Sequence, residues 1–150
     1  MRLLVPPPLQ AFLFAVAMAL AARAFPGLAV TFPGQVALAV GLAALGLAID
    51  LTAVVAFLRS RTTVNPLRPA KARMLVATGL YRFTRNPMYL GLLLVLSGWA
   101  VWLGHGLAAA IVPLFVVAVT ELQIKPEEAA LEAKFGEPYR AYRRKVRRWI

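Results

Sequence analysis

The sequence predicts an all-α integral membrane protein with about four transmembrane helices. Hydrophobic residues make up 61% of its 150 residues, charged residues only 15%, and the mean hydropathy is +0.71. This composition lies well beyond that of ordinary soluble domains. The apolar residues also form long runs, several of which could cross a bilayer core of about 30 Å. We therefore expect a single membrane domain covering residues 1–150.

The first two apolar runs give the first two predicted spans. One lies at about residues 9–25, and the second covers residues 35–58. The second run contains one acidic residue, Asp50. An acid inside a membrane helix is by default a candidate functional group. The alternative is that Asp50 lies near enough to the interface to pair with an arginine of the loop that follows.

The third and fourth spans come from one long uncharged stretch. No charged residue occurs from 86 to 120, which is enough for two short spans of about 17 residues each. Gly104-His105-Gly106 interrupts this stretch. We therefore predict a tight helical hairpin at 104–106, between spans at about 87–103 and 107–124, with His105 as a turn residue.

Two basic segments flank the apolar runs. Of the 17 lysines and arginines, seven lie in the loop 59–86 and eight in the tail 125–150. Positively charged loops of membrane proteins face the cytoplasm. We therefore expect both segments and both termini to be cytoplasmic, at a cell membrane that we take to be the inner membrane of a bacterium.

The tail is predicted to be an amphipathic helical segment at the cytoplasmic membrane surface. Apolar and aromatic residues recur there at steps of three and four, with an interruption near Gly136-Glu137-Pro138. These residues are Leu131, Phe135, Tyr139, Tyr142, Val146 and Trp149.

Composition and charge placement exclude several kinds of partner. The net charge of +11 could indicate nucleic-acid binding. However, the charges flank apolar segments, as in cytoplasmic loops, so we expect no nucleic-acid partner. The chain has no cysteine and one histidine, so thiolate chemistry is excluded and no metal site is expected.

The polar and aromatic stretch from Gly79 to Gly91 precedes the third span directly. Asn86 is predicted to cap that helix, with Pro87 in its first turn. The free backbone N–H groups of Met88 and Tyr89 would then face the cytoplasmic boundary, where they could meet an acceptor or an anion. The plainer interpretation of the same residues is a capped helix with interfacial aromatics.

Together with the tail, this stretch resembles a known family. The shared elements, in order, are Tyr81-Arg82, Arg85-Asn86-Pro87-Met88-Tyr89, Gly91, an apolar hairpin, Glu127-Glu128, Leu131, Phe135-Gly136, Tyr139, Tyr142 and Arg148-Trp149-Ile150. This series is similar to the isoprenylcysteine carboxyl methyltransferase and phospholipid methyltransferase superfamily. The resemblance covers roughly residue 62 to the C terminus. Asn86 stands where the prenylcysteine enzymes usually carry histidine, which leaves the acceptor open.

The resemblance implies an S-adenosylmethionine-dependent methyltransferase with a cytoplasm-facing cofactor pocket. Arg85 could bind the cofactor carboxylate, and tyrosine rings could face its adenine or its sulfonium. Alone, the two adjacent glutamates would instead be interpreted as complementing a helix dipole. The cofactor-binding residues implied are Tyr81, Asn86, Pro87, Met88, Tyr89, Glu127, Glu128 and Tyr139.

The implied methyl acceptor is a lipophilic small molecule or a lipidated substrate that arrives from the bilayer. Membrane lipids are the other expected partners. Methyl transfer needs positioning and a path without water, and no metal. The candidate catalytic residues are Arg85 and Asp50. A carboxylate acceptor would favour Arg85, whereas an amine would favour Asp50, which could also take its proton.

Two other classes of membrane protein stay possible on the sequence alone. A small four-helix exporter could use Asp50 as a proton-coupled site, but it gives no role to the Asn-Pro-Met-Tyr and Glu-Glu elements. A non-catalytic membrane protein could keep the outline of the pocket. A soluble Rossmann-type methyltransferase is excluded, because no Gly-x-Gly-x-x-Gly follows a strand.

Overall fold

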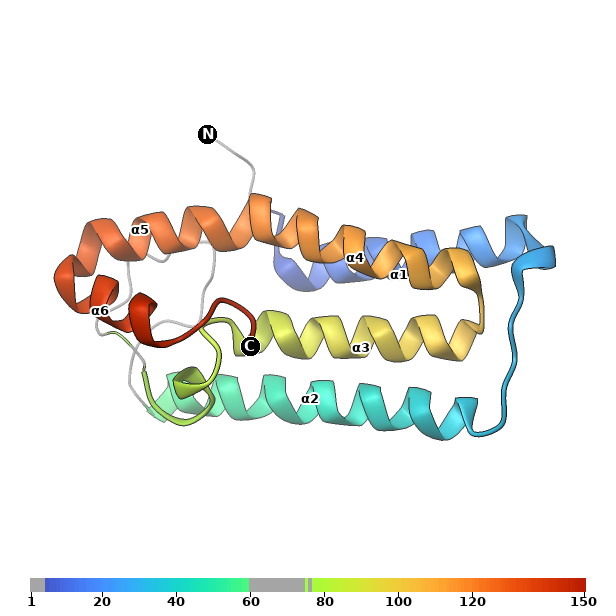
Figure 1. The fold of residues 1–150 in the computed structure, drawn as a ribbon, viewed down its shortest axis with the longest axis horizontal. Helices are drawn as coiled ribbons and strands as arrows, with labels where there is room; N and C mark the ends of the chain where they lie inside the picture. Colours follow the sequence, from blue (N-terminus) through green and yellow to red (C-terminus); the bar gives the residue numbers. More distant parts are fainter. Residues whose placement is uncertain (1–4, 60–74, 76) are drawn as a thin grey trace.

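The computed structural model describes residues 5–59, 75 and 77–150, which form a helical bundle with a helical tail (Figure 1). The bundle helices are α1 (Pro7–Ala24), α2 (Gln35–Arg59), α3 (Pro87–Leu103) and α4 (Gly106–Val119). The tail consists of a π-helical turn, η4 (Thr120–Ile124), followed by α5 (Lys125–Phe135) and α6 (Glu137–Lys145). The described residues contain no strand beyond an isolated bridge between Ala29 and His105, which confirms the all-α prediction.

Three helical stretches are long and apolar enough to cross a membrane. They are Pro7–Ala24, Gln35–Ala56 and Gly106–Phe135, and α3 adds an apolar helix of 17 residues. Only 17% of the apolar window in each of the first two stretches is buried inside the molecule. Large side chains such as Phe12 face outward. Such faces suit a lipid environment, as expected for a membrane protein. The positions of the bilayer boundaries stay a prediction.

Helix α3 occupies the centre of the bundle. It contacts α1, α2 and α4, and Figure 1 shows it between α2 and the α1–α4 pair. A Cβ on Gly46 would lie 2.6 Å from the carbonyl oxygen of Gly91, and a Cβ on Gly98 would lie 2.7 Å from that of Ala39. Small residues let membrane helices approach this closely. We call this contact line the α2–α3 seam.

The opposite side of α3 faces the apolar core. Leu96 and Ala100 of α3 are buried there with Met18 of α1 and Phe115 of α4. Trp99 adds a directional contact, because its Nε1 donates to the carbonyl oxygen of Ala15 on α1 at 3.0 Å. These contacts fix α3 against α1 and α4.

The connection between α3 and α4 is the predicted tight hairpin. Gly104 has a φ of +55°, a conformation that glycine adopts without steric cost. Its carbonyl oxygen accepts a hydrogen bond from the backbone N–H of Val30 at 2.7 Å. His105 is buried, with its Nε2 2.8 Å from the carbonyl oxygen of Phe25. The hairpin prediction is therefore confirmed, and His105 serves as a turn residue.

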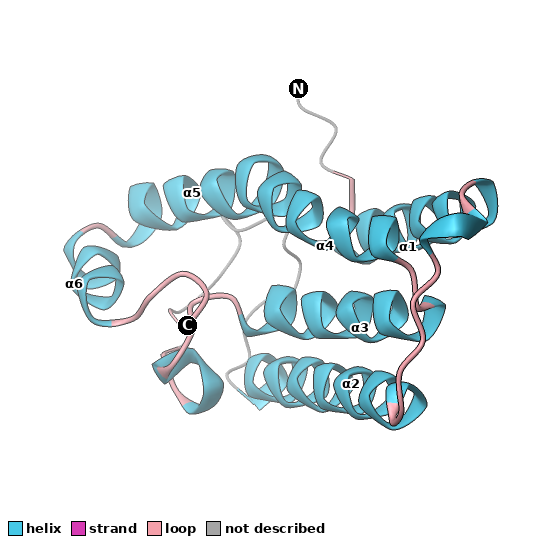
Figure 2. Cartoon of the chain, turned by 45° about the vertical axis from the view of Figure 1, so that its right-hand side comes forward, coloured by secondary structure: helices cyan, strands magenta, loops and turns pink. Residues whose placement is uncertain are grey.

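The tail returns to the bundle. In both views α5 continues the line of α4 past the Pro87 end of α3, and α6 then folds back (Figure 2). Gly136, with a φ of +60°, separates the two helices. The backbone N–H of Arg85 donates to the carbonyl oxygen of Arg147 at 3.0 Å. The residues after α6 therefore lie against the segment that precedes α3.

The orientation predicted from the basic segments can be tested with single cysteines, because the chain contains none. Phe32, in the α1–α2 connection, and Glu137, in α6, are both exposed. We expect Phe32→Cys to react with a membrane-impermeant maleimide in intact cells, and Glu137→Cys to react only after permeabilisation. The reverse pattern would place the tail outside.

Candidate active site

The polar groups of the sequence motifs gather at one end of the bundle. Here the short 3-10 helix η3 (Gly79–Arg82) leads into α3, and α5 continues from α4. The C-terminal segment, residues 146–150, returns to the same place (Figure 2). Three parts of the chain that are far apart in sequence therefore meet.

Glu128 lies between two arginines at this meeting point. Its Oε1 is 2.7 Å from Arg85 Nη2, while Arg148 Nε and Nη2 donate to Oε1 and Oε2 at 3.0 and 2.8 Å. The side chains of Glu128 and Arg85 are each 9% exposed. Arg85 Nη1 also donates to the carbonyl oxygens of Arg143 and Val146. Because buried charges need such partners, this triad ties the start of α3, α5 and the C-terminal segment together.

Asn86 stands at the N-cap position of α3, but its side chain makes no capping hydrogen bond. Its Nδ2 instead donates to the carbonyl oxygen of Arg148 at 2.9 Å, and the hydroxyl of Thr84 donates to the same oxygen at 3.2 Å. The prediction of a side-chain cap is therefore wrong. The returning C-terminal backbone offers an acceptor to the amide group, and this long-range contact replaces the local one.

Glu127 has different surroundings from Glu128. The Tyr89 hydroxyl donates to Glu127 Oε1 at 2.6 Å, and Tyr89 is buried. Among the described residues, no arginine or lysine forms an ion pair with Glu127. Of two adjacent carboxylates, one is therefore held by two guanidinium groups and the other only by a phenol.

The remaining tyrosines, Tyr81, Tyr139 and Tyr142, contact one another near this cluster. Tyr139 is buried beside Tyr142, and the Tyr142 hydroxyl donates to the carbonyl oxygen of Tyr81 at 2.7 Å. Burial raises the pKa of Tyr139 to about 12. Burial also raises the pKa of Tyr81, and Tyr142, Glu127 and Asp50 act in the same direction. Both phenols therefore stay neutral at physiological pH.

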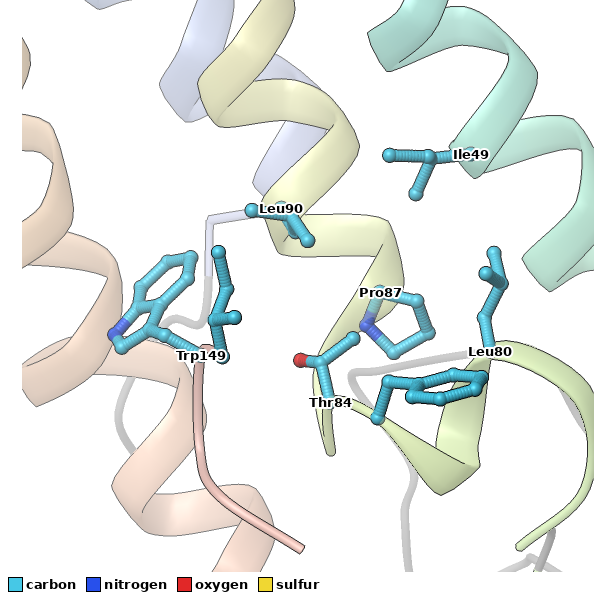
Figure 3. A pocket seen from close by; sticks show the side chains of 8 residues that line it. Ile49, Leu80, Thr84, Pro87, Leu90 and Trp149 are labelled. Carbon is cyan, nitrogen blue, oxygen red and sulfur yellow. The ribbon is translucent and has the colours of Figure 1, made fainter.

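An apolar pocket of about 210 Å³ opens beside the start of α3 (Figure 3). Pro87 forms part of its wall, whereas Met88 packs against the buried pair Ala53 and Tyr81. Neither contributes to the arginine–glutamate triad. The residues lining the pocket are Ile49, Leu80, Phe83, Thr84, Pro87, Leu90, Trp149 and Ile150.

Asp50 faces the α2–α3 seam. Its Oδ1 is buried and has no hydrogen-bond partner among the residues that the structure describes. A Cβ placed on Gly91 of α3 would collide with the Asp50 carboxylate group. Arg59 and the other described cations form no ion pair with it. The sequence also left open an ion pair between Asp50 and an arginine of the following loop. The other arginines at the start of that loop are among residues 60–74, which lie outside the described part of the chain.

The structure brings together most residues that the sequence singled out. Arg85, Asn86, Tyr89, Glu127, Glu128 and Tyr139 lie at one end of the bundle, with Tyr81 beside Tyr142. Sequence reasoning assigned no role to Arg148 or Gly91, although both belong to the elements that carry the resemblance. Among the described residues, no group of three or more His, Asp or Glu side chains could hold a metal ion.

Comparison with known proteins identifies sequence relatives. The phospholipid methyltransferase family model matches residues 34–138. A protein-S-isoprenylcysteine O-methyltransferase of Schizosaccharomyces pombe is 30% identical over 108 residues, which cover 72% of this chain and 46% of that protein. An uncharacterised protein of Haemophilus influenzae is 51% identical over 63 residues, which cover 42% of this chain and 100% of that protein. No solved structure matches.

The family match covers much of the site, although Tyr139 and the C-terminal segment with Arg148 lie beyond it. It extends over α2, α3, α4 and α5, and it includes Asp50, Arg85, Tyr89 and the Glu127-Glu128 pair. The matched range is more than half of the 150 residues. The chain therefore belongs to the phospholipid methyltransferase family.

Proposed function

We propose that this chain is an S-adenosylmethionine-dependent methyltransferase that modifies a lipophilic acceptor at the cytoplasmic face of the membrane. Family membership supports a membrane methyltransferase. The structural observation that carries the proposal is the Tyr89–Glu127 pair. It presents a carboxylate without a cation partner among the described residues, next in sequence to Glu128, whose carboxylate is paired with two guanidinium groups.

The charge of the cofactor fits this pair. S-adenosylmethionine carries a positive sulfonium, an ammonium group and ribose hydroxyls, all of which a carboxylate can attract or accept. Glu127 is the carboxylate we assign to it, oriented by the hydrogen bond from Tyr89. Tyr81 and Tyr139, which the resemblance implied as cofactor contacts, are buried, so we give them a supporting role behind the site. Basic residues outnumber acids in the tail, and Glu127 is its acid without an ion-pair partner among the described residues.

Glu128, Arg85 and Asn86 have a positioning role in this proposal. Arg85 donates to Glu128 and to two backbone carbonyl oxygens, so its guanidinium offers little to a ligand carboxylate. Asn86 holds the backbone of Arg148. Together these residues hold the C-terminal segment against the start of α3. This contact fixes the positions of Trp149 and Ile150 in the wall of the apolar pocket.

The bound cofactor would supply a methyl group carried on a sulfonium. This chain's own residues would hold the acceptor in line with it and exclude water. The apolar pocket, with Trp149, Pro87 and Leu90 in its wall, suits the apolar part of a lipophilic acceptor. The pocket adjoins the start of α3, where Tyr89 and Glu127 also lie. The acceptor could therefore reach the start of α3 from the bilayer while the cofactor reaches it from the cytoplasm.

The exporter alternative is not favoured. It rests on Asp50 alone, whereas the family match covers Asp50 together with the Tyr89 and Glu127 elements. A non-catalytic relative that binds the cofactor without turnover is the remaining alternative, and an activity measurement separates it from an enzyme.

A transfer assay with methyl-labelled S-adenosylmethionine tests the proposal. Purified protein in lipid nanodiscs would be incubated with a bacterial membrane lipid extract and the labelled cofactor. We expect label to enter the organic phase in proportion to protein and time, and S-adenosylhomocysteine to suppress it. Cofactor binding without any labelled product would indicate a non-catalytic relative, and absence of both would contradict the proposed function.

A further inference from the structure

We propose that a surface beside the apolar pocket binds the head groups of anionic phospholipids in the surrounding membrane. We call this surface the basic rim. It consists of the cations Arg82, Lys145 and Arg147 and of the apolar side chains of Phe83 and Ile150, all of them exposed. The inference concerns the lipids that surround the site, not the methyl acceptor. It therefore stands independently of the proposed methyl transfer.

Two segments that are distant in sequence form the basic rim. Arg82 is the last residue of η3, and Arg147 follows the end of α6. The Tyr142 hydroxyl donates to the carbonyl oxygen of Tyr81 at 2.7 Å. The backbone N–H of Arg85 donates to the carbonyl oxygen of Arg147 at 3.0 Å. These two hydrogen bonds hold the segment that carries Arg82 against the segment that carries Arg147.

The cations of the basic rim form no ion pair with any acid among the described residues. The acids of the tail bond to other side chains: Glu127 to Tyr89, Glu128 to Arg85 and Arg148, Glu132 to Arg143, and Glu137 to Arg140 and Arg144. The basic rim therefore carries an uncompensated positive charge. Such a charge attracts an anionic surface, and the cytoplasmic leaflet of a membrane provides one.

Apolar side chains beside the cations favour a membrane over a soluble acidic partner. Phe83 is 72% exposed and follows Arg82 directly in the chain. Phe83 and Ile150 also belong to the lining of the apolar pocket. Apolar side chains at a membrane surface insert among acyl chains, while neighbouring basic side chains reach the lipid phosphates. A soluble acidic polymer would leave this apolar surface in water.

Helix α6 turns its apolar side to the protein rather than to the membrane. Tyr139 and Val146 are buried, and the Tyr142 hydroxyl bonds to the backbone of η3. The apolar side of α6 is therefore already covered by the chain itself. This arrangement differs from an amphipathic helix that lies with its apolar side on the membrane. It leaves the basic rim as the part of the tail that we assign to the lipid surface.

Lipid selectivity in nanodiscs tests the proposal. Protein would be reconstituted into an equal mixture of phosphatidylglycerol and phosphatidylcholine, with brominated acyl chains on one of the two lipids at a time. Bromine quenches nearby tryptophans, and Trp149 lines the pocket beside the basic rim. Trp99 and Trp102 lie towards the opposite end of α3 and give a background common to all variants.

We expect brominated phosphatidylglycerol to quench the wild-type protein more strongly than brominated phosphatidylcholine. We also expect this excess quenching to shrink at high salt, because salt screens exposed charges. Equal quenching by the two lipids at low salt would overturn the proposal.

The double variant Arg82→Gln/Arg147→Gln should lose most of the excess quenching. Each basic side chain near an anionic surface contributes up to about fivefold to affinity. Neither cation has an ion-pair partner in the described part of the chain, so we expect the fold to be kept.

Lys134→Gln/Arg140→Gln is the matched control, because it removes the same charge from exposed residues on either side of the α5–α6 turn. Figure 1 shows this turn at the end of the molecule farthest from the α3–α4 hairpin. We expect this variant to keep most of the excess quenching. Equal losses in the two double variants would show that only the net charge of the tail matters, and would contradict the basic rim.

Glycerol 3-phosphate distinguishes a lipid surface from a site for free phosphate. At constant ionic strength, we expect an excess of glycerol 3-phosphate to leave the excess quenching unchanged, because it offers no acyl chain to Phe83 and Ile150. Loss of the excess quenching would show that the cations bind a soluble phosphate, and would contradict the membrane partner.

Discussion

Replacing Glu128 by glutamine should lower the free energy of unfolding by about 3 kcal/mol and greatly weaken S-adenosylmethionine binding. The substitution leaves Arg85, only 9% exposed, without its carboxylate partner. Removing one partner of a buried pair typically costs about 3–5 kcal/mol, because the other charge stays buried. The lower end applies here, since Arg148 is 34% exposed and can regain water.

The stability effect can be measured by following tryptophan fluorescence during thermal unfolding in detergent. Glu121→Gln is a suitable control, because Glu121 pairs with Lys125 on the same helical stretch but both side chains are about half exposed. Exposed pairs contribute about 0–1 kcal/mol, so this variant should unfold close to the wild type. Equal stability of the two variants would show that the Arg85–Glu128–Arg148 triad does not hold the C-terminal segment.

Replacing Glu127 by glutamine should weaken S-adenosylmethionine binding about 10–100-fold while the fold is kept. The change removes a carboxylate that no described cation compensates, so no buried cation is left without its partner, and the amide oxygen can still accept from Tyr89. A hydrogen bond to a charged group contributes about 1.5–3 kcal/mol, which corresponds to that loss in affinity. Tyr89→Phe should cause a smaller loss, because it removes the hydroxyl that orients Glu127 but keeps the carboxylate.

Titration calorimetry with the purified variants provides this comparison. Glu132→Gln is the matched control, since Glu132 lies on the same helix but pairs with Arg143 near the surface. We expect its cofactor affinity to equal that of the wild type. If Glu127→Gln also bound like the wild type, Glu127 would be only a partner of Tyr89, and the cofactor site would have to lie elsewhere.

Much of the fold could be predicted from the sequence because its signals are local. Uninterrupted apolar runs indicate membrane helices wherever they occur, and Gly104 permits the sharp turn between α3 and α4. The grouping of Tyr89 with Glu127 was also predictable, from a short hairpin that returns the chain to one end of the bundle. These inferences need only the pattern along the chain.

The partner of each polar group depends on tertiary contacts, which the sequence pattern does not contain. Asn86 has the sequence context of an N-cap, yet its amide bonds to the backbone of Arg148, 62 residues away. Arg85 was a candidate anion-binding residue, but Glu128 and the C-terminal backbone engage it. Likewise, the sequence does not indicate that α3 packs Gly91 against Asp50, whose Oδ1 has no hydrogen-bond partner in the described part of the chain. Local rules identify such residues without assigning their partners.

Binding of S-adenosylmethionine to the purified wild-type protein tests the central claim most directly. We expect one saturable site per chain, with a dissociation constant between about 1 µM and 1 mM, the usual range for enzyme substrates. S-adenosylhomocysteine should compete for it, and Glu127→Gln should weaken it. A folded protein in lipid nanodiscs that shows no binding at about 1 mM cofactor would contradict the account.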